Sequence, residues 1–363
     1  MRVADVSQLF LNWFNETYPF EGQKNDQRCQ RNFGIYLELI GYPELFLMPD
    51  DFYIFDIFRS IQDFNNHKVE TRNIFDQYSL IVAKRIWINV VPGQDLHMDY
   101  LFHYPHEVSS FLSGQGNYSQ EETAQIAACI SLLEDYDSPI EKSLDLTNLI
   151  PMSALRDNSS QSGWLYRLNN IRMQIIEELT PWQKSENFEY TFVDSTTVMA
   201  PSSEEGRDII LKNILKFSMK LFIGKVTFGC QYFDVQYTNS PMAEKNLTLG
   251  INWMGLFIIN NGQILQSISY PSIKTVQIVK KKVQQNSPAE KIIQISINNA
   301  KKFDKHAPIM NAVIKLKIPS TCPLSSKAMK LDKMEEVKGL ILNYQEMSKR
   351  LSFTLISFQN LTK

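Results

Sequence analysis

The sequence predicts an α+β protein with three lobes: a mixed lobe, a helical lobe, and a β-sandwich capped by one helix. At 363 residues the chain is too long for one ordinary hydrophobic core. Apolar residues change from mixed spacing to helical spacing near residue 95, and to strand spacing near residue 224. The charge changes at the same places, which supports boundaries there.

The three segments differ strongly in charge. Residues 1–94 carry 9 basic and 12 acidic residues, a net charge of −3. Residues 95–223 carry 9 and 19, a net charge of −10, and residues 224–363 carry 19 and 8, a net charge of +11. Acidic and basic segments in one chain suggest lobes with different partners.

The composition excludes several classes of protein. Hydrophobic residues make up 44% and charged residues 21%, as in a globular protein. No window offers ~18 uninterrupted apolar residues, and the amphipathic N-terminus is a poor secretory signal. The four cysteines are widely scattered, without CxxC spacing, which is typical of reduced thiols in a cytoplasmic protein.

The first lobe alternates helices and strands. Residues 3–17 place apolar side chains at helical spacing, which predicts an amphipathic helix. Residues 33–40 and 44–48 read as two strands, and residues 49–51 open a short helix whose acidic residues suit its N-terminal end. The apolar run 79–89 predicts a third strand.

The second lobe is predicted to hold four helices. Ser119 and Glu122 form a capping box that begins the second of them. A polar, aromatic excursion covers roughly residues 183–200. The other three helices are expected at residues 97–111, at residues 164–179, and from about residue 202 to residue 222.

The third lobe reads as seven strands followed by one helix, the pattern of a PH-like sandwich. Asn260-Asn261-Gly262 is a hairpin turn of the Asn-Gly type. The final helix is expected over residues 329–351. The strands are expected at residues 229–238, 246–251, 254–260, 263–269, 273–281, 290–297 and 311–318.

Several strings, in this order, carry a family resemblance. LFLMPDDFYIFDIFRSIQDF resembles the end of a ubiquitin-like lobe, and AKRIWINVVPGQDLHMDYLFHYPHEVSSFLSG resembles a crossing into a helical lobe. ILKFSMKLFIGKVTFGCQYFDVQYT resembles a helix-to-sandwich junction, and GINWMGLFIIN resembles the second and third strands of a PH-like lobe. Together they resemble the FERM domain of a myosin tail, of the class VII-like unconventional type.

The resemblance implies a three-lobed FERM cloverleaf. Residues 1–94 would form the ubiquitin-like lobe, residues 95–223 the acyl-CoA-binding-protein-like lobe, and residues 224–363 the PH-like lobe. The family's first lobe opens with a β-hairpin, whereas this chain begins inside the helix that follows. We therefore expect an N-terminally truncated first lobe, from a longer polypeptide or a truncated gene model, with the edge of strand 79–89 left open.

A peptide groove is the first candidate site. The resemblance implies that an extended ligand adds a strand beside the fifth strand of the last lobe, next to the final helix. The candidates are Val276 and Ile278 on the strand, and Leu340 and Tyr344 on the helix. The alternative is that all four are core residues, and it weighs more for Leu340 and Ile278.

A basic surface on the last lobe is the second candidate site. Lysines near anionic lipid headgroups contribute on the order of 1 kcal/mol each, so anionic membrane lipids such as phosphoinositides are candidate ligands. The alternative is solvated strand ends and loops. Nucleic acid is disfavoured, because Arg350 is the lobe's only arginine and aromatic residues are sparse there. The candidate lysines are Lys280, Lys281, Lys282, Lys301, Lys302 and Lys305.

No pattern of catalytic residues stands out. His103 and His106 have spacing that could suit a metal, but no third ligand is evident. The sequence has neither a GxSxG elbow nor a GxxxxGK[ST] phosphate loop, so motor ATPase activity cannot belong to these residues. We expect no catalytic site, no metal and no cofactor.

The expected function is therefore binding. The resemblance implies the cargo-binding and regulatory part of a myosin-like tail, which binds cytoplasmic tails, adaptor proteins or the cytoskeleton, and folds back on a myosin motor in cis. The alternative is a stand-alone FERM linker between plasma membrane proteins and the actin cytoskeleton. An enzyme of unknown type is disfavoured.

Overall fold

The contacts of the chain divide it into two compact units. The sandwich unit comprises residues 1–89, 230–260 and 264–363, and the helical unit comprises residues 90–229 and 261–263. The division of the sandwich unit into separate first and third lobes stays a prediction. The computed structural model describes residues 1–20, 28–39, 45–66, 78–137, 145–156, 161–179, 190–191, 200–201, 204–237, 247–281, 290–297, 313–318 and 333–350.

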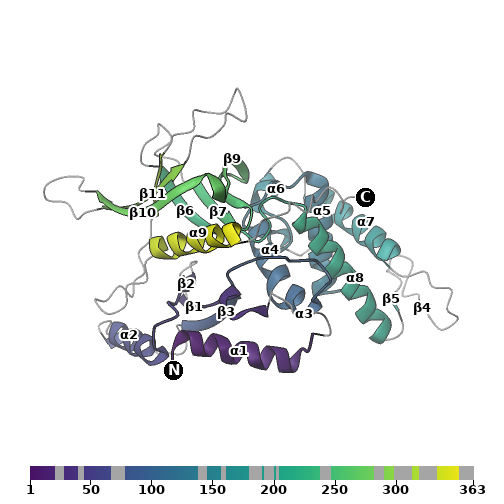
Figure 1. Cartoon of the computed structure of the whole chain (residues 1–363). Coiled ribbons are helices and arrows are strands. Elements are labelled where there is room, and N and C mark those ends of the chain that lie inside the picture. The colour runs from purple at the N-terminus through teal and green to yellow at the C-terminus, as the bar shows by residue number, and fades with distance from the viewer. Residues whose placement is uncertain are drawn as a thin grey trace. The chain divides into compact units, whose positions relative to one another are not determined.

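The first part of the sandwich unit confirms the predicted alternation of helices and strands. Three antiparallel strands pair in the order β2-β1-β3. Val3 of α1 and Ile57 of α2 pack with Ile35 and Leu37 of β1 in one buried cluster. The elements are α1 (Val3–Thr17), β1 (Phe33–Leu39), β2 (Leu45–Leu47), α2 (Ile54–Asn66) and β3 (Tyr78–Lys84) (Figure 1).

Strand β3 is shorter than predicted. The sequence predicts a strand to Asn89, but the ladder ends at Lys84. The reason is that the amides of Arg85 and Ile86 both donate to the carbonyl oxygen of Asn32, at 2.7 and 3.2 Å. The chain then leaves β1, and the next residues join the core of the seven-stranded sheet. Among the described residues no strand pairs with the outer edge of β3.

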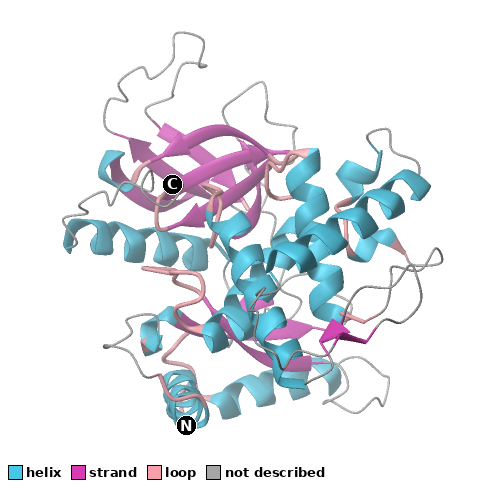
Figure 2. Cartoon of the chain, turned by 90° about the vertical axis from the view of Figure 1, so that its right-hand side faces the viewer, coloured by secondary structure: helices cyan, strands magenta, loops and turns pink. Residues whose placement is uncertain are grey.

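The larger sheet confirms the predicted seven strands to within a few residues. Their order is β10-β11-β12-β6-β7-β8-β9, so β10 and β9 are the edge strands. Figure 2 shows this sheet in magenta, strongly curved. The strands are β6 (Gln231–Tyr237), β7 (Leu247–Asn252), β8 (Gly255–Asn260), β9 (Gln263–Ile268), β10 (Ile273–Lys281), β11 (Glu290–Ile297) and β12 (Val313–Lys317).

Helix α9 (Lys333–Arg350) closes the sandwich, as predicted (Figure 1). Val337, Leu340 and Ile341 lie at helical spacing and are buried in the same core cluster as the strands. The predicted turn is also confirmed. Asn261 and Gly262 both have positive φ, 47° and 76°, which an Asn-Gly hairpin turn requires.

The helical unit contains more helices than the four predicted. Small residues of α5 let it pack closely on α7 and α8, and its capping box between Ser119 and Glu122 is confirmed. The short strands β4 (Tyr190–Thr191) and β5 (Ala200–Pro201) pair with each other. The helices are α3 (Leu96–Met98), the π-helix η4 (Asp99–His103), α4 (Tyr104–Leu112), α5 (Gln120–Glu134), α6 (Met152–Arg156), α7 (Gln161–Leu179) and α8 (Glu204–Ile223).

The predicted continuous helix over residues 97–111 is wrong in one respect, because a π-helical turn interrupts it. The amide of Tyr104 donates to the carbonyl of Asp99, five residues back. Pro105 follows, and it has no amide to donate. A proline inside a helix also clashes with the carbonyl four residues earlier, so the helix widens there.

Among the helices that the structure describes, none combines the length and the hydropathy that a membrane span requires.

Candidate binding sites

The edge of β10 beside α9 is where the sequence predicts a peptide groove. Because β10 is the last strand of the sheet, one side of its backbone has no partner strand among the described residues. Helix α9 packs against β10. The side-chain amide of Gln345 donates to the carbonyl oxygen of Ile273 at 2.8 Å, which joins the helix to the start of this strand.

The four groove candidates come together, but three of them are buried. Val276, Leu340 and Tyr344 belong to the core cluster, and Ile278 is partly buried against it. Of the four, only Ile278 offers surface to a ligand. The assignment of this groove as a ligand site stays a prediction.

Tyr344 has a structural role that the sequence did not indicate. Its ring stacks on Tyr270 with 5.8 Å between centroids, and its hydroxyl oxygen accepts a hydrogen bond from the amide of Trp87 at 2.9 Å. Burial raises the pKa of Tyr344 well above its usual range. The residue therefore fixes the chain after β3 to helix α9.

The predicted basic surface is only partly within the described residues. Lys280 is exposed, and it pairs across the strands with Lys291, which is also exposed. Two like charges directly opposite each other on neighbouring strands are unfavourable. Lys281 lies at the end of β10, opposite Glu290. Lys282, Lys301, Lys302 and Lys305 lie outside the described residues.

Buried charged groups concentrate in the helical unit. Asp99 Oδ1 lies 2.7 Å from His103 Nδ1, and both side chains are inaccessible to solvent. Asp99 Oδ2 accepts a hydrogen bond from the amide of Gly93 at 2.6 Å. One carboxylate oxygen of Asp99 thus holds the imidazole of His103. The other holds Gly93, close to the residue where the helical unit begins.

Glu107 makes a similar hydrogen bond near Gly229, where the long segment of the helical unit ends. Its Oε1 accepts a hydrogen bond from the amide of Gly229 at 2.7 Å, and Gly229 has a φ of +67°. Burial raises the pKa of Glu107 to about 8, although the Gly229 amide opposes the shift. A carboxyl group whose pKa lies close to neutral pH therefore holds the turn at Gly229 through this hydrogen bond.

Among the described residues these buried groups belong to no cluster that could hold a metal ion. His103 has no exposed surface, so it cannot reach a substrate. Over the described part of the chain, no three His, Cys, Asp or Glu side chains gather closely enough to hold a metal ion.

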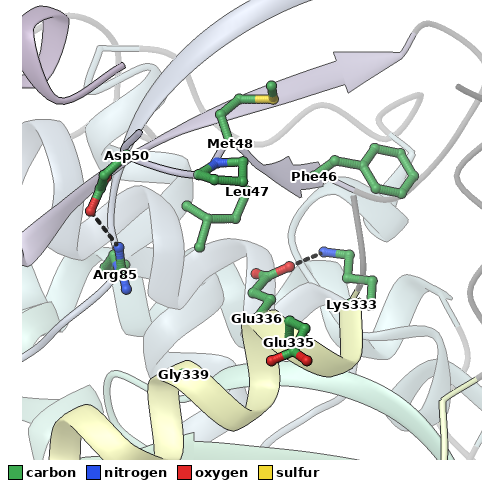
Figure 3. A pocket seen from close by; sticks show the side chains of 10 residues that line it. Phe46, Leu47, Met48, Asp50, Arg85, Lys333, Glu335, Glu336 and Gly339 are labelled. Atoms are coloured by element: carbon green, nitrogen blue, oxygen red, sulfur yellow. Dashed lines mark ion pairs between the residues drawn. The ribbon is translucent and has the colours of Figure 1, made fainter. Parts of the chain in front are cut away.

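A cleft of about 240 Å³ lies within the sandwich unit, between β2 and the first half of α9 (Figure 3). Two ion pairs flank it: Arg85 with Asp50 at 3.7 Å, and Lys333 with Glu336 at 3.0 Å. Figure 3 shows Leu47 between these pairs, with the α9 backbone at Gly339 opposite. The lining residues are Phe46, Leu47, Met48, Pro49, Asp50, Arg85, Lys333, Glu335, Glu336 and Gly339.

Sequence reasoning missed this cleft. Its walls come from residues almost 300 positions apart in the chain, and no local pattern joins them. One local signal was present, however: Gly339 is an isolated glycine inside an amphipathic helix, which often has a packing or functional reason.

The architecture is similar to that of solved FERM domains. The chain aligns with the human myosin 7b C-terminal MyTH4-FERM domain, solved in complex with the harmonin-a PDZ3 domain, with a TM-score of 0.61 and 15% identity. The alignment covers 97% of this chain and 56% of that one. The chain therefore has the FERM fold, with a mixed α+β architecture.

Curated relatives point to a particular kind of FERM protein, although no family model matches the chain. It is 23% identical over 244 residues to myosin-VIIa of Drosophila melanogaster, covering 66% of this chain. It is 24% identical over 220 residues to unconventional myosin-VIIb of Mus musculus, covering 59%. The matched segments span about a tenth of those proteins, 10% and 9%. The predicted resemblance to a class VII-like myosin tail is confirmed.

Proposed function

We propose that this chain is a non-catalytic binding module, the cargo-binding and regulatory part of the tail of an unconventional myosin-like protein. The observation that carries the proposal is the FERM fold over 97% of the chain, shared with a myosin MyTH4-FERM domain. Its partners would be cytoplasmic tails or adaptor proteins. The complex of human myosin 7b with a PDZ domain supports protein partners for this chain as well.

The proposal includes the organisation of the domain and its place in the cell. Residues 1–94, 95–223 and 224–363 would form the three FERM lobes, and the chain would work in the cytoplasm, at the cytoskeleton or at a membrane. The +11 charge of residues 224–363 supports attraction to anionic lipids, including phosphoinositides. A myosin motor in cis is a further partner that the tail resemblance suggests.

The edge of β10 is the proposed protein-binding surface. An extended ligand could hydrogen-bond to the unpaired side of this strand and place an apolar side chain against Ile278. Leu340 and Tyr344 would support the groove from below without direct contact.

Affinity capture with matched variants tests this surface. The immobilised full chain would be incubated with a cytoplasmic extract, as wild type, as Ile278→Asp and as Leu265→Asp. Leu265 is an exposed apolar residue on β9, the opposite edge strand. We expect specific proteins to be retained by wild type and Leu265→Asp and lost from Ile278→Asp. Identical sets from all three would reject β10 as the binding surface.

A further inference from the structure

Strand β3 is an edge strand without the features that usually protect an edge. Native sheets keep their edges from pairing with other chains by short strands, charged side chains, proline or bulges. The edge strand β2 spans only three residues, and the edge strand β10 carries three lysines. Strand β3 spans seven residues, and residues 78–83 include neither a charge nor a proline. Its register with β1 is continuous, so no bulge bends it away.

The backbone groups of Leu80 and Val82 point away from β1. The amide of Arg85 donates to the carbonyl of Asn32, in line with the register that continues along β3. Hydrogen-bonded and non-hydrogen-bonded pairs alternate along an antiparallel ladder. Residues 79, 81 and 83 therefore bond to β1, whereas Leu80 and Val82 direct their amides and carbonyls outward, where a further strand can pair with them.

The side chains of Leu80 and Val82 lie on the face of the sheet that α1 covers, but the cover is incomplete. Leu80 is directly opposite Leu37, and Val82 is opposite Ile35, so each pair shares a face. Leu37 and Ile35 pack with Val3 of α1. Leu37 is inaccessible to solvent, whereas Leu80 is 37% exposed. The helix therefore covers β1 and leaves apolar surface on β3.

The sequence of β3 is complementary to itself. If two copies pair antiparallel about Ile81, Leu80 of each copy faces Val82 of the other. Both residues have outward backbone groups, so they form a hydrogen-bonded pair, and their aliphatic side chains meet on the same face. The other opposite pairs are Ser79 with Ala83 and Tyr78 with Lys84. Small residues thus face each other, and no two like charges do.

We propose that two copies of this chain associate by antiparallel pairing of their β3 strands about Ile81. The two three-stranded sheets would then be continuous, and the two-fold symmetry of the contact would close the assembly at two copies. The pairing does not involve β10, so this inference goes beyond the proposed function and does not rest on it.

Sedimentation equilibrium of the full chain tests the association. The mass of the wild type should change from that of one copy to that of two as its concentration rises, without larger species. Leu80→Lys places a charge against Val82 of the second copy and should weaken the association roughly tenfold or more. Leu265→Lys, at a similarly exposed leucine of the edge strand β9, is the matched control and should associate as the wild type does.

Cysteine crosslinking tests the register. Ile81 would face itself in a non-hydrogen-bonded pair, whose Cα atoms lie about 4.5 Å apart, within reach of a disulfide. With diamide as the oxidant, Ile81→Cys should give a covalent dimer. Leu80→Cys should crosslink far less, because its counterpart lies diagonally across the pair, at roughly 7–8 Å. The wild type controls for the native cysteines.

Four results would overturn the proposal. The first is the mass of a single copy at concentrations up to about 100 µM. The others are a mass that keeps growing with concentration, an association that Leu80→Lys leaves unchanged, and a dimer that Ile81→Cys does not crosslink. If the chain is a single copy and Ile81→Cys resists a thiol reagent, another segment of the same chain covers β3 instead.

Discussion

The two units of this chain differ in how deeply their charged side chains are buried. In the helical unit, Asp95, Asp99, His103, Glu107 and Arg172 are buried, and each of them accepts or donates a hydrogen bond. In the sandwich unit Lys84 is buried, and Arg85, Lys333 and Glu336 around the cleft are largely buried, whereas Lys280 of β10 and Lys291 of β11 are exposed. Buried charge fixes the backbone, whereas exposed charge is available to ligands. We therefore expect pH to act on the helical unit and salt to act on ligand binding by the sandwich unit.

The largest expected effect comes from removing Asp99. Asp99→Ala leaves His103 buried without its carboxylate and the amide of Gly93 without its acceptor. Breaking a buried pair on one side costs about 3–5 kcal/mol. Urea unfolding would measure it, with single-tryptophan versions that keep Trp164 for the helical unit or Trp87 for the sandwich unit.

Asp208→Ala, at an exposed acid on α8, is the matched control and should change the unfolding free energy little. If Asp99→Ala lowered only the transition reported by Trp87, the structural role assigned to Asp99 would be wrong.

Glu107 should make stability depend on pH. Its pKa is raised to about 8 in the folded chain, against an ordinary value of 4.5. Between these values the folded state binds the proton more tightly, so stability is greatest below pH 4.5 and falls as pH rises through 8. At about 1.4 kcal/mol per unit of pKa, the loss is on the order of 5 kcal/mol.

Glu107→Gln keeps an acceptor for the Gly229 amide but cannot ionise. We expect the variant to resemble the wild type at pH 5 and to exceed its stability at pH 9, as measured by urea unfolding at several pH values. Parallel pH profiles of the two proteins would contradict the raised pKa.

The smallest expected effect concerns the lysines of the sandwich unit. Changing Lys280, Lys281 and Lys282 together to Glu removes three attractions of about 1 kcal/mol each, a loss on the order of 100-fold in affinity for anionic vesicles. Co-sedimentation at two salt concentrations would measure it. The same change at Lys212, Lys216 and Lys220 of α8 is the control and should leave vesicle binding intact. Unchanged binding of the first variant would reject the lipid proposal.

Local patterns explain why much of the fold could be predicted. Each strand of the sandwich is a short apolar run between turn residues, and Asn260-Asn261-Gly262 specifies its own hairpin. The π-helical turn before Pro105 was missed, because the apolar spacing on either side of it remains helical. Strand β3 was predicted too long, because its ladder depends on a residue more than 50 positions earlier. The carbonyl of Asn32 accepts hydrogen bonds from the amides of Arg85 and Ile86, and the ladder ends there.

The candidate sites were harder to predict than the fold. Leu340 and Tyr344 lie next to the strand, as the resemblance implies, but periodicity cannot distinguish a groove wall from core. The cleft at Arg85 and the hydrogen bond from Gly229 to Glu107 depend on contacts between distant segments. Of the features that form the cleft, only the isolated glycine at position 339 can be recognised from the sequence alone.

The order of the two units along the chain has a mechanical consequence. Residues 90–229 are inserted between two parts of the sandwich unit, which contact each other through Trp87 and Tyr344 and through a shared core. Tension applied to the first and last helices is borne by those contacts, and it reaches the inserted residues only after the contacts rupture. The helical unit is therefore shielded from such force until the sandwich unit comes apart.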